Sequence, residues 1–156
     1  MNEEFLHYVW KYQLFSFHDL KTTIEEDLTI LKVGSHNHNS GPDFLNSKIE
    51  INNQLWFGNI EIHVKSSDWY VHHHEIDHNY DAVILHVVWE DDATIFMKDN
   101  KPLPVLVLKD FVFKSALNNY QKAIESYIEV HKVHPYMKSP LIMIEKLQLQ
   151  IKKESI

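Results

Sequence analysis

The stretch FLNSKIEINNQLWFGNIEIHVK, residues 44–65, predicts a β-hairpin at the centre of the fold. Apolar and polar residues alternate over Phe44–Ile51 and again over Gln54–Lys65, as they do in strands with two unlike faces. Asn52 and Asn53 stand between the two runs and tolerate the left-handed backbone that tight hairpin turns need. The two runs are therefore expected to pair as antiparallel strands.

The flanking segments predict one α/β or α+β domain, built as a mixed sheet flanked by helices. Residues 1–109 are expected to form the α/β core, and residues 110–156 a C-terminal helical extension packed on it. Asp110 is a plausible N-cap for the first helix of that extension. The expected helices are Glu3–Phe15, Asp110–Glu129 and Leu141–Lys153, with a short one in the polar stretch Ser66–Asp81. The further strands are Asp27–Val33, Ala82–Trp89, Thr94–Met97 and Val105–Leu108.

Composition narrows the range of functions. The chain has 156 residues, of which 44% are hydrophobic, as in an ordinary globular protein. The absence of cysteine excludes disulfides and thiolate metal sites, whereas twelve histidines are unusually many. A net charge of −7 argues against tight non-specific DNA binding, which depends on cationic side chains. With no signal peptide and no apolar run of about 18 residues, the protein is expected to be cytoplasmic and to have no contact with a membrane.

The second hairpin strand carries the first candidate site. Glu61, His63 and Lys65 share one face of it, which forms either a solvent-exposed face or a site. With a strict two-residue turn, Asp43 would pair with Ile62 and lie on the apolar face. A slip by one residue, from a longer loop or from a bulge near Gly58, would bring Asp43 to Glu61 or His63.

A convergence of Asp43 with Glu61 would create a site for a divalent cation. Two carboxylates supply the hard oxygen ligands that Mg²⁺ or Mn²⁺ prefers. Lys65 or His63 would then orient or deprotonate an attacking water, and the metal would polarise a phosphodiester oxygen.

The histidines of HHHEIDH, residues 72–78, form a second candidate metal site. On a helix, His74 and His78 would face the same ion at i, i+4 spacing. His86, inside the apolar run VILHVV, or His63 could complete a zinc site with them. The alternatives are a solvent-exposed polar turn of a histidine-rich protein and adventitious binding of metal.

Two family resemblances extend these expectations. The "PD" of GPDF and the acid of GNIEIHVK, with the order helix, three strands, helix, strand, resemble the PD-(D/E)XK nucleases. That resemblance implies that Asp43 and Glu61 are metal ligands and that Lys65 or His63 replaces the lysine, since histidine stands where the pattern has lysine. The runs FLHYVWKYQLF, SGPDFLNSKIEI, GNIEIHVKSSDWYVHHH and YDAVILHVVWEDD resemble an uncharacterised bacterial family, domain of unknown function 2851, over Phe5–Asp92. This second resemblance implies a common fold and no established activity.

Three functional hypotheses follow. The first is a metal-dependent, nuclease-like hydrolase acting on the phosphodiesters of nucleic acid. The second is a non-catalytic binding or scaffold domain with a nuclease-like fold, which forms homo-oligomers through its C-terminal helices. The third is a histidine-based metalloprotein unrelated to nucleic acid.

Overall fold

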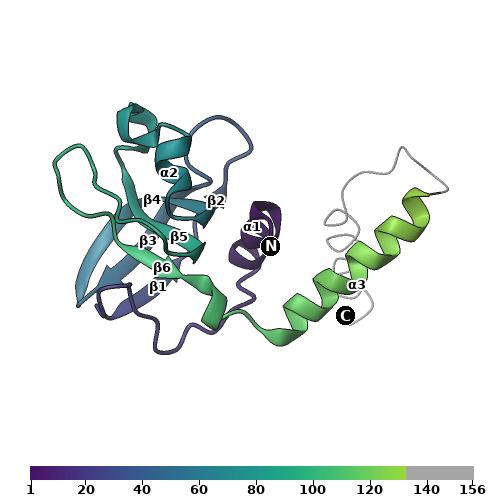
Figure 1. Cartoon of the computed structure of the whole chain (residues 1–156). Helices are drawn as coiled ribbons and strands as arrows, with labels where there is room; N and C mark the ends of the chain where they lie inside the picture. Colours follow the sequence, from purple (N-terminus) through teal and green to yellow (C-terminus); the bar gives the residue numbers. More distant parts are fainter. Residues whose placement is uncertain (133–156) are drawn as a thin grey trace. The chain divides into compact units, whose positions relative to one another are not determined.

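A mixed six-stranded sheet is the main element of the fold, in a computed structural model that describes residues 1–132 (Figure 1). The chain divides into two compact units, Met1–Val112, which contains the sheet, and Phe113–Ile156. The strand order is β1-β3-β4-β5-β6, with β2 paired to β3. The strands are β1 (Leu28–Lys32), β2 (Ser35–His36), β3 (Phe44–Ile51), β4 (Gln54–Lys65), β5 (Val83–Glu90) and β6 (Val105–Val107). This confirms the predicted α/β class, with helices before and after the sheet in the chain.

The central hairpin has the predicted bounds. β3 and β4 pair antiparallel from Ile51↔Gln54 to Ser47↔Gly58. Asn52 and Asn53 have φ angles of 48° and 64°, which are the left-handed values of a tight hairpin turn. The local sequence signals therefore fix both the turn and the strand pairing next to it.

Further along the hairpin, a β-bulge changes the pairing by one residue. Two residues of β3 lie between the paired positions Phe44 and Ser47, whereas one residue of β4 lies between Gly58 and Ile60. Asn46, with φ of 58°, is the left-handed residue of the bulge. Phe44 consequently pairs with Ile60, so the strand enters the hairpin in the shifted register.

The connection from β4 to β5 returns the chain parallel to β4. It contains the short helix α2 (Asp68–Val71) and two 3₁₀ turns, η1 (His74–Ile76) and η2 (His78–Tyr80). β5 then runs through the interior with both of its faces mostly buried, as its apolar sequence predicts. The polar connection between β4 and β5 therefore leads directly into a buried strand of the sheet.

Helix α1 (Glu3–Lys11) contacts β4, and Figure 1 shows it beside the sheet. The Asn2 side chain caps it by accepting a hydrogen bond of 2.9 Å from the Phe5 N–H. The helix ends earlier than the predicted Phe15, because Gln13 adopts a left-handed φ of 56°. α1 thus has defined ends and packs against the strand that carries Glu61 and His63.

Two local predictions are wrong. Thr94–Met97 forms no strand, only an isolated bridge between Phe96 and Pro102, because proline has no N–H for a ladder. Asp110 is not an N-cap: it ends the 3₁₀ turn η3 (Leu108–Asp110), and α3 (Lys114–His131) starts after the extended residue Phe113. The helix predicted over Leu141–Lys153 lies outside the described residues, and the packing of the extension on the core stays a prediction.

Candidate metal centre

Both faces of β4 are buried where the candidate residues lie. Glu61 and His63 are 4% and 1% exposed, and Ile60 and Ile62 on the opposite face are fully buried. The solvent-exposed alternative is therefore wrong for Glu61 and His63. A buried carboxyl and a buried imidazole require polar partners, which the following contacts supply.

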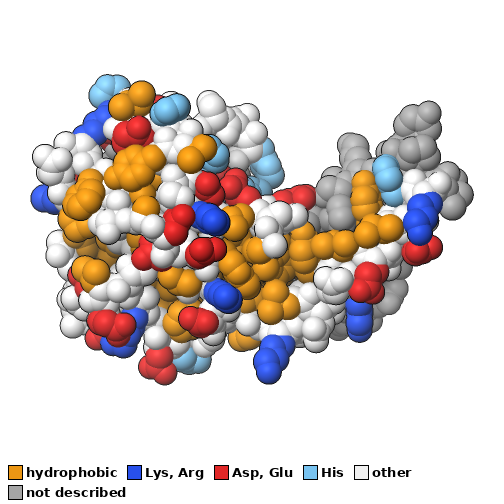
Figure 2. Space-filling view, in the orientation of Figure 1, with side chains coloured by type: hydrophobic (Ala, Val, Ile, Leu, Met, Phe, Trp, Pro, Cys, Tyr) orange, Lys and Arg blue, Asp and Glu red, His pale blue; other side chains and the backbone are white. Residues whose placement is uncertain are grey.

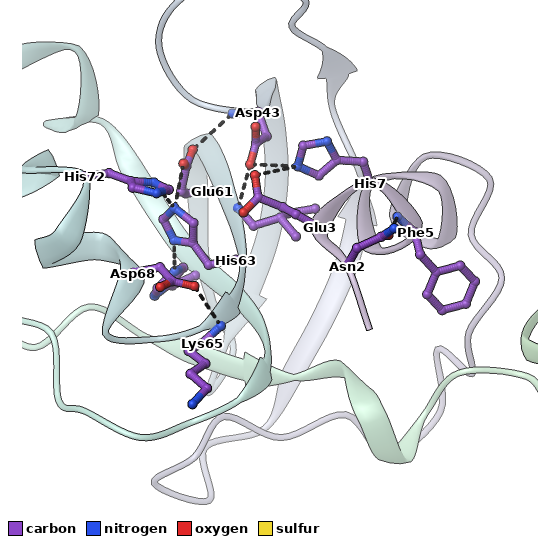
Figure 3. Close-up of polar contacts among 12 residues, drawn as sticks. Asn2, Glu3, Phe5, His7, Asp43, Glu61, His63, Lys65, Asp68 and His72 are labelled. Carbon is purple, nitrogen blue, oxygen red and sulfur yellow. Dashed lines mark hydrogen bonds and ion pairs between the residues drawn. The ribbon is translucent and has the colours of Figure 1, made fainter. Parts of the chain in front are cut away.

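The bulge brings Asp43 to Glu61. The Asp43 N–H donates a hydrogen bond of 3.2 Å to Glu61 Oε2, and Asp43 Oδ2 accepts one of 2.8 Å from the Ile62 N–H (Figure 3). The one-residue slip that the sequence left open is thus present, and it results from the extra residue near Asn46. Asp43 and Glu61 belong to one polar site.

Three histidines converge next to Glu61. One ring nitrogen from each of His63, His72 and His74 lies within 4.8 Å of the other two. His63 Nε2 and His72 Nδ1 are 3.1 Å apart. His73, between the two crossover histidines, has a left-handed φ of 58° and is exposed, so the chain turns there and both neighbours face His63. We refer to His63, His72 and His74 as the histidine cluster.

His78 is not part of the cluster. The predicted helix through His74 and His78 is instead two 3₁₀ turns separated by the extended residue Asp77, so the i, i+4 spacing is lost. The exposed His78 ring lies 3.0 Å from Asp81 Oδ2. The predicted pairing of His74 with His78 on one face of a helix is therefore wrong.

Glu61 Oε1 lies next to the cluster and contacts two of its rings. It lies 3.4 Å from His63 Nε2 and 3.1 Å from His74 Nε2. Ligand atoms about 2.1 Å from a tetrahedral zinc ion are separated by roughly 3.4 Å, so these separations suit ligands of a common ion. His74 Nε2 is buried, and its contact with Glu61 lacks hydrogen-bond geometry, which leaves this nitrogen without a hydrogen-bond partner. Several imidazole nitrogens favour a transition metal such as zinc over magnesium.

Burial sets the charge state of this centre. Burial, and secondly the negative charge of Asp43, raises the pKa of Glu61 to about 9. Burial, and secondly the neighbouring His86, lowers the pKa of His63 to about 2. Without a bound ion the centre therefore consists largely of neutral groups at pH 7. Neutral imidazole is the form that binds a metal.

His86 lies behind His63. It is fully buried on β5, and its Nε2 lies 2.8 Å from His63 Nδ1. The sequence placed His86 among the weaker candidate ligands. The structure places its Nε2 against the side of His63 that faces away from His72.

The sequence analysis missed His7 and Glu3, which come from α1. His7 Nε2 is 3.2 Å from Asp43 Oδ2 and 3.9 Å from Glu3 Oε1 (Figure 3). Burial acts to lower the pKa of His7, but the contact with Asp43 and the nearby acids raise it on balance. The i, i+4 spacing of Glu3 and His7 on one helix was the available signal.

Lys65 is the one predicted catalytic residue that the structure does not bring to the centre. It is exposed at the end of β4, and its backbone N–H donates to Asp68 Oδ2 at 3.2 Å. Figure 3 shows its side chain extending away from Glu61 and His63.

The first unit also contains a cleft of about 770 Å³ that shares no residue with the histidine cluster. Trp56, Phe57 and Ile24 line it and are 43%, 68% and 69% exposed. Figure 2 shows several hydrophobic side chains at the surface of this unit, with acidic and basic side chains mixed among them. Within residues 1–132, no helix has both the length and the apolar character needed to cross a membrane.

Comparison with known proteins places the chain in one family. Neither the curated proteins nor the solved structures yield a match. These comparisons do not link the chain to the PD-(D/E)XK nucleases. The family described as "Protein of unknown function (DUF2851)" matches residues 3–151, which is nearly the whole chain. The resemblance seen in the sequence is thereby confirmed, and the chain belongs to the DUF2851 family.

Proposed function

We propose that this protein is a metal-dependent hydrolase whose histidine cluster holds a zinc-type ion. The observation that carries the proposal is the convergence of three ring nitrogens within 4.8 Å, one of them the buried and unpartnered Nε2 of His74. A bound ion would supply Lewis acidity and lower the pKa of a water ligand. Unpaired nitrogens at such a site are costly unless a ligand engages them.

Glu61 is the proposed acid–base group. Its Oε1 lies beside His63 and His74, within reach of a water at the same centre. Its Oε2 accepts the Asp43 N–H, and Asp43 is in turn held by the Ile62 N–H and by His7. These contacts fix the carboxyl group of Glu61 relative to the cluster, as a proton-transfer group requires.

Phosphodiesters of nucleic acid are the proposed substrate class. The element order and the pairing of Asp43 with Glu61 support it, because both are features of the nuclease-like pattern. The chain has fifteen lysines and no arginine, and Lys65 lies away from the centre, so a bound ion would carry most of the contact with a phosphate. Mg²⁺ or Mn²⁺ between Asp43 and Glu61 is the alternative ion, and the imidazole-rich donor set favours zinc over both.

A two-stage experiment tests this function. Metal analysis of tag-free protein should find close to one transition-metal ion per chain, lost in His63→Ala and His74→Ala but kept in the control His78→Ala. Cleavage of single- and double-stranded DNA and RNA is then assayed with Zn²⁺, Mn²⁺ and Mg²⁺. Glu61→Gln and Asp43→Ala should abolish cleavage without loss of far-ultraviolet circular dichroism. Unchanged cleavage in both variants would reject the assignment.

A structural metal site is the second candidate. The burial of His63 and His74, 1% and 8% exposed, favours it, because structural zinc sites are closed whereas catalytic sites keep an open position. This candidate predicts stoichiometric metal, a higher melting temperature with metal, and no turnover of any substrate. Exchange of a cluster-bound water, measured on cobalt-substituted protein by its visible spectrum with added azide, separates the two candidates.

A further inference from the structure

We infer that His86 is a positioning residue, which accepts a hydrogen bond from His63 Nδ1 and so leaves His63 Nε2 free to bind the ion. The inference rests on the metal site proposed above. It assigns to His86 a role on His63 and not on the ion itself.

The contact between the two rings is short and held by the sheet. His63 Nδ1 lies 2.8 Å from His86 Nε2, and the ring planes are perpendicular, with centroids 5.0 Å apart. The two residues come from the paired strands β4 and β5. The backbone N–H of His86 also donates a hydrogen bond of 2.9 Å to the backbone oxygen of Pro104. Both side chains are almost fully buried, so neither ring can exchange this partner for water.

The contact matters because it determines which ring nitrogen of His63 carries the proton. A neutral imidazole carries one N–H and one lone pair. A proton on His63 Nε2 would occupy the atom that faces His72 and Glu61, whereas a proton on Nδ1 requires an acceptor on the other side. His86 Nε2 is in the right place to be that acceptor. A hydrogen bond from the second ring nitrogen is how proteins orient metal-binding histidines.

The remaining nitrogen of His86 shows which side of the ring makes its polar contact. His86 Nδ1 is buried and has no hydrogen-bond partner among the described residues. An apolar residue would fill the same space without an unpartnered polar atom. The polar contact that explains a histidine at this position is therefore the one between its Nε2 and His63.

His72 is expected to change its tautomer when an ion binds, whereas His63 keeps the same tautomer. The Nδ1 of His72 lies 3.1 Å from His63 Nε2, so with the lone pair of His63 at Nε2 the His72 Nδ1–H would be the donor in the metal-free protein. The His72 ring is exposed, so no buried partner fixes which of its nitrogens carries the proton when an ion replaces this hydrogen bond. The cluster then has one buried ligand with a fixed tautomer and one exposed ligand that changes its tautomer.

The test uses the full, tag-free chain and Zn²⁺ as the probe. Zinc affinity is measured by chelator competition for wild type, His86→Leu, His86→Gln and the exposed control His78→Ala. His86→Leu should bind about 10- to 100-fold more weakly. His86→Gln, which keeps an acceptor, should recover most of the loss, and His78→Ala should match wild type. His86→Leu with unchanged affinity would overturn the inference.

Two-bond ¹⁵N–¹H correlation spectra read the tautomers directly. They should show His63 with its proton on Nδ1 in both the metal-free and the zinc-loaded wild type, and His72 changing from Nδ1–H to Nε2–H. A metal-free His63 protonated on Nε2 would refute the role of His86, whether or not His86→Leu folds. If wild type binds no zinc, the proposed metal site fails, and the His63 tautomer still decides the role of His86.

Discussion

Replacement of Glu61 by glutamine should remove most of the loss of stability that the metal-free protein shows above pH 7. The pKa of Glu61 is raised from 4.5 to about 9 by burial and by Asp43, so the folded protein keeps a proton that the unfolded chain has lost. Unfolding releases that proton throughout this range, and stability falls as the pH rises. At about 1.4 kcal/mol per pH unit, Glu61 alone contributes a loss of about 2 kcal/mol between pH 7 and pH 8.5. Glutamine cannot ionise, so its variant should lack this slope.

The histidines give the opposite slope at lower pH. Burial lowers the pKa of His63 to about 2 and that of His86 to about 3, so both stay neutral in the folded protein. Their contribution is present above the unfolded value of 6.5 and is lost as the pH falls toward the folded values. Two such histidines outweigh the single Glu61 between pH 4.5 and pH 6.5. His36 and His74, whose pKa values are also lowered by burial, act in the same direction, so the metal-free protein should be most stable near pH 7.

Urea unfolding in the presence of a chelator measures this dependence from pH 5.5 to pH 9. Wild type is compared with Glu61→Gln and with the control Glu90→Gln, an exposed glutamate on β5. His7, whose pKa is also raised, adds to the fall above pH 7 and is retained in all three proteins. The reasoning is refuted if wild-type stability does not fall between pH 7 and pH 8.5, or if Glu61→Gln falls as steeply as wild type.

Three further predictions concern the hairpin and the ion. Gly58→Ala should cost about 1–3 kcal/mol in urea unfolding, because an added Cβ would meet Ala82 O and the Ile84 side chain; an unchanged midpoint contradicts this. Asn46→Val should lose about 1–2 kcal/mol at the left-handed bulge position and weaken zinc binding, whereas Asn46→Gly should keep both close to wild type. Zinc at a hundred times its Kd should stabilise the protein by about 2.7 kcal/mol in the same assay. That gain should vanish with chelator or in His74→Ala.

The sequence predicts the two hairpin strands well and their offset poorly. The bounds of β3 and β4 follow from alternation and from the Asn-Asn turn, which are local signals. The bulge depends on one asparagine in a left-handed conformation, and nothing in FLNSKIEI distinguishes Asn46 from an ordinary strand residue. The position of Asp43 beside Glu61 could therefore be stated only as one of two registers.

The candidate site was predictable to the extent that it depends on strand period. That Glu61 and His63 share a face follows from the two-residue repeat, but the burial of that face depends on α1 and on the crossover, which the repeat does not describe. His72 and His74 meet because His73 is left-handed, a feature that HHH does not reveal. His7 enters through the packing of a helix far away in the sequence.

The energetics of the centre argue that it serves a purpose other than stability. Glu61, His63, His74 and His86 are all at least nine-tenths buried, in an interior where apolar side chains would contribute more. Their mutual contacts do not satisfy them: His74 Nε2 and His86 Nδ1 have no hydrogen-bond partner among the described residues. An ion bound by the cluster would engage the first of these atoms, and the second is the consequence of orienting His63 through Nε2. The proposed ion and the orientation of His63 would together account for these two unpartnered nitrogens, whereas the hairpin and the core account for neither.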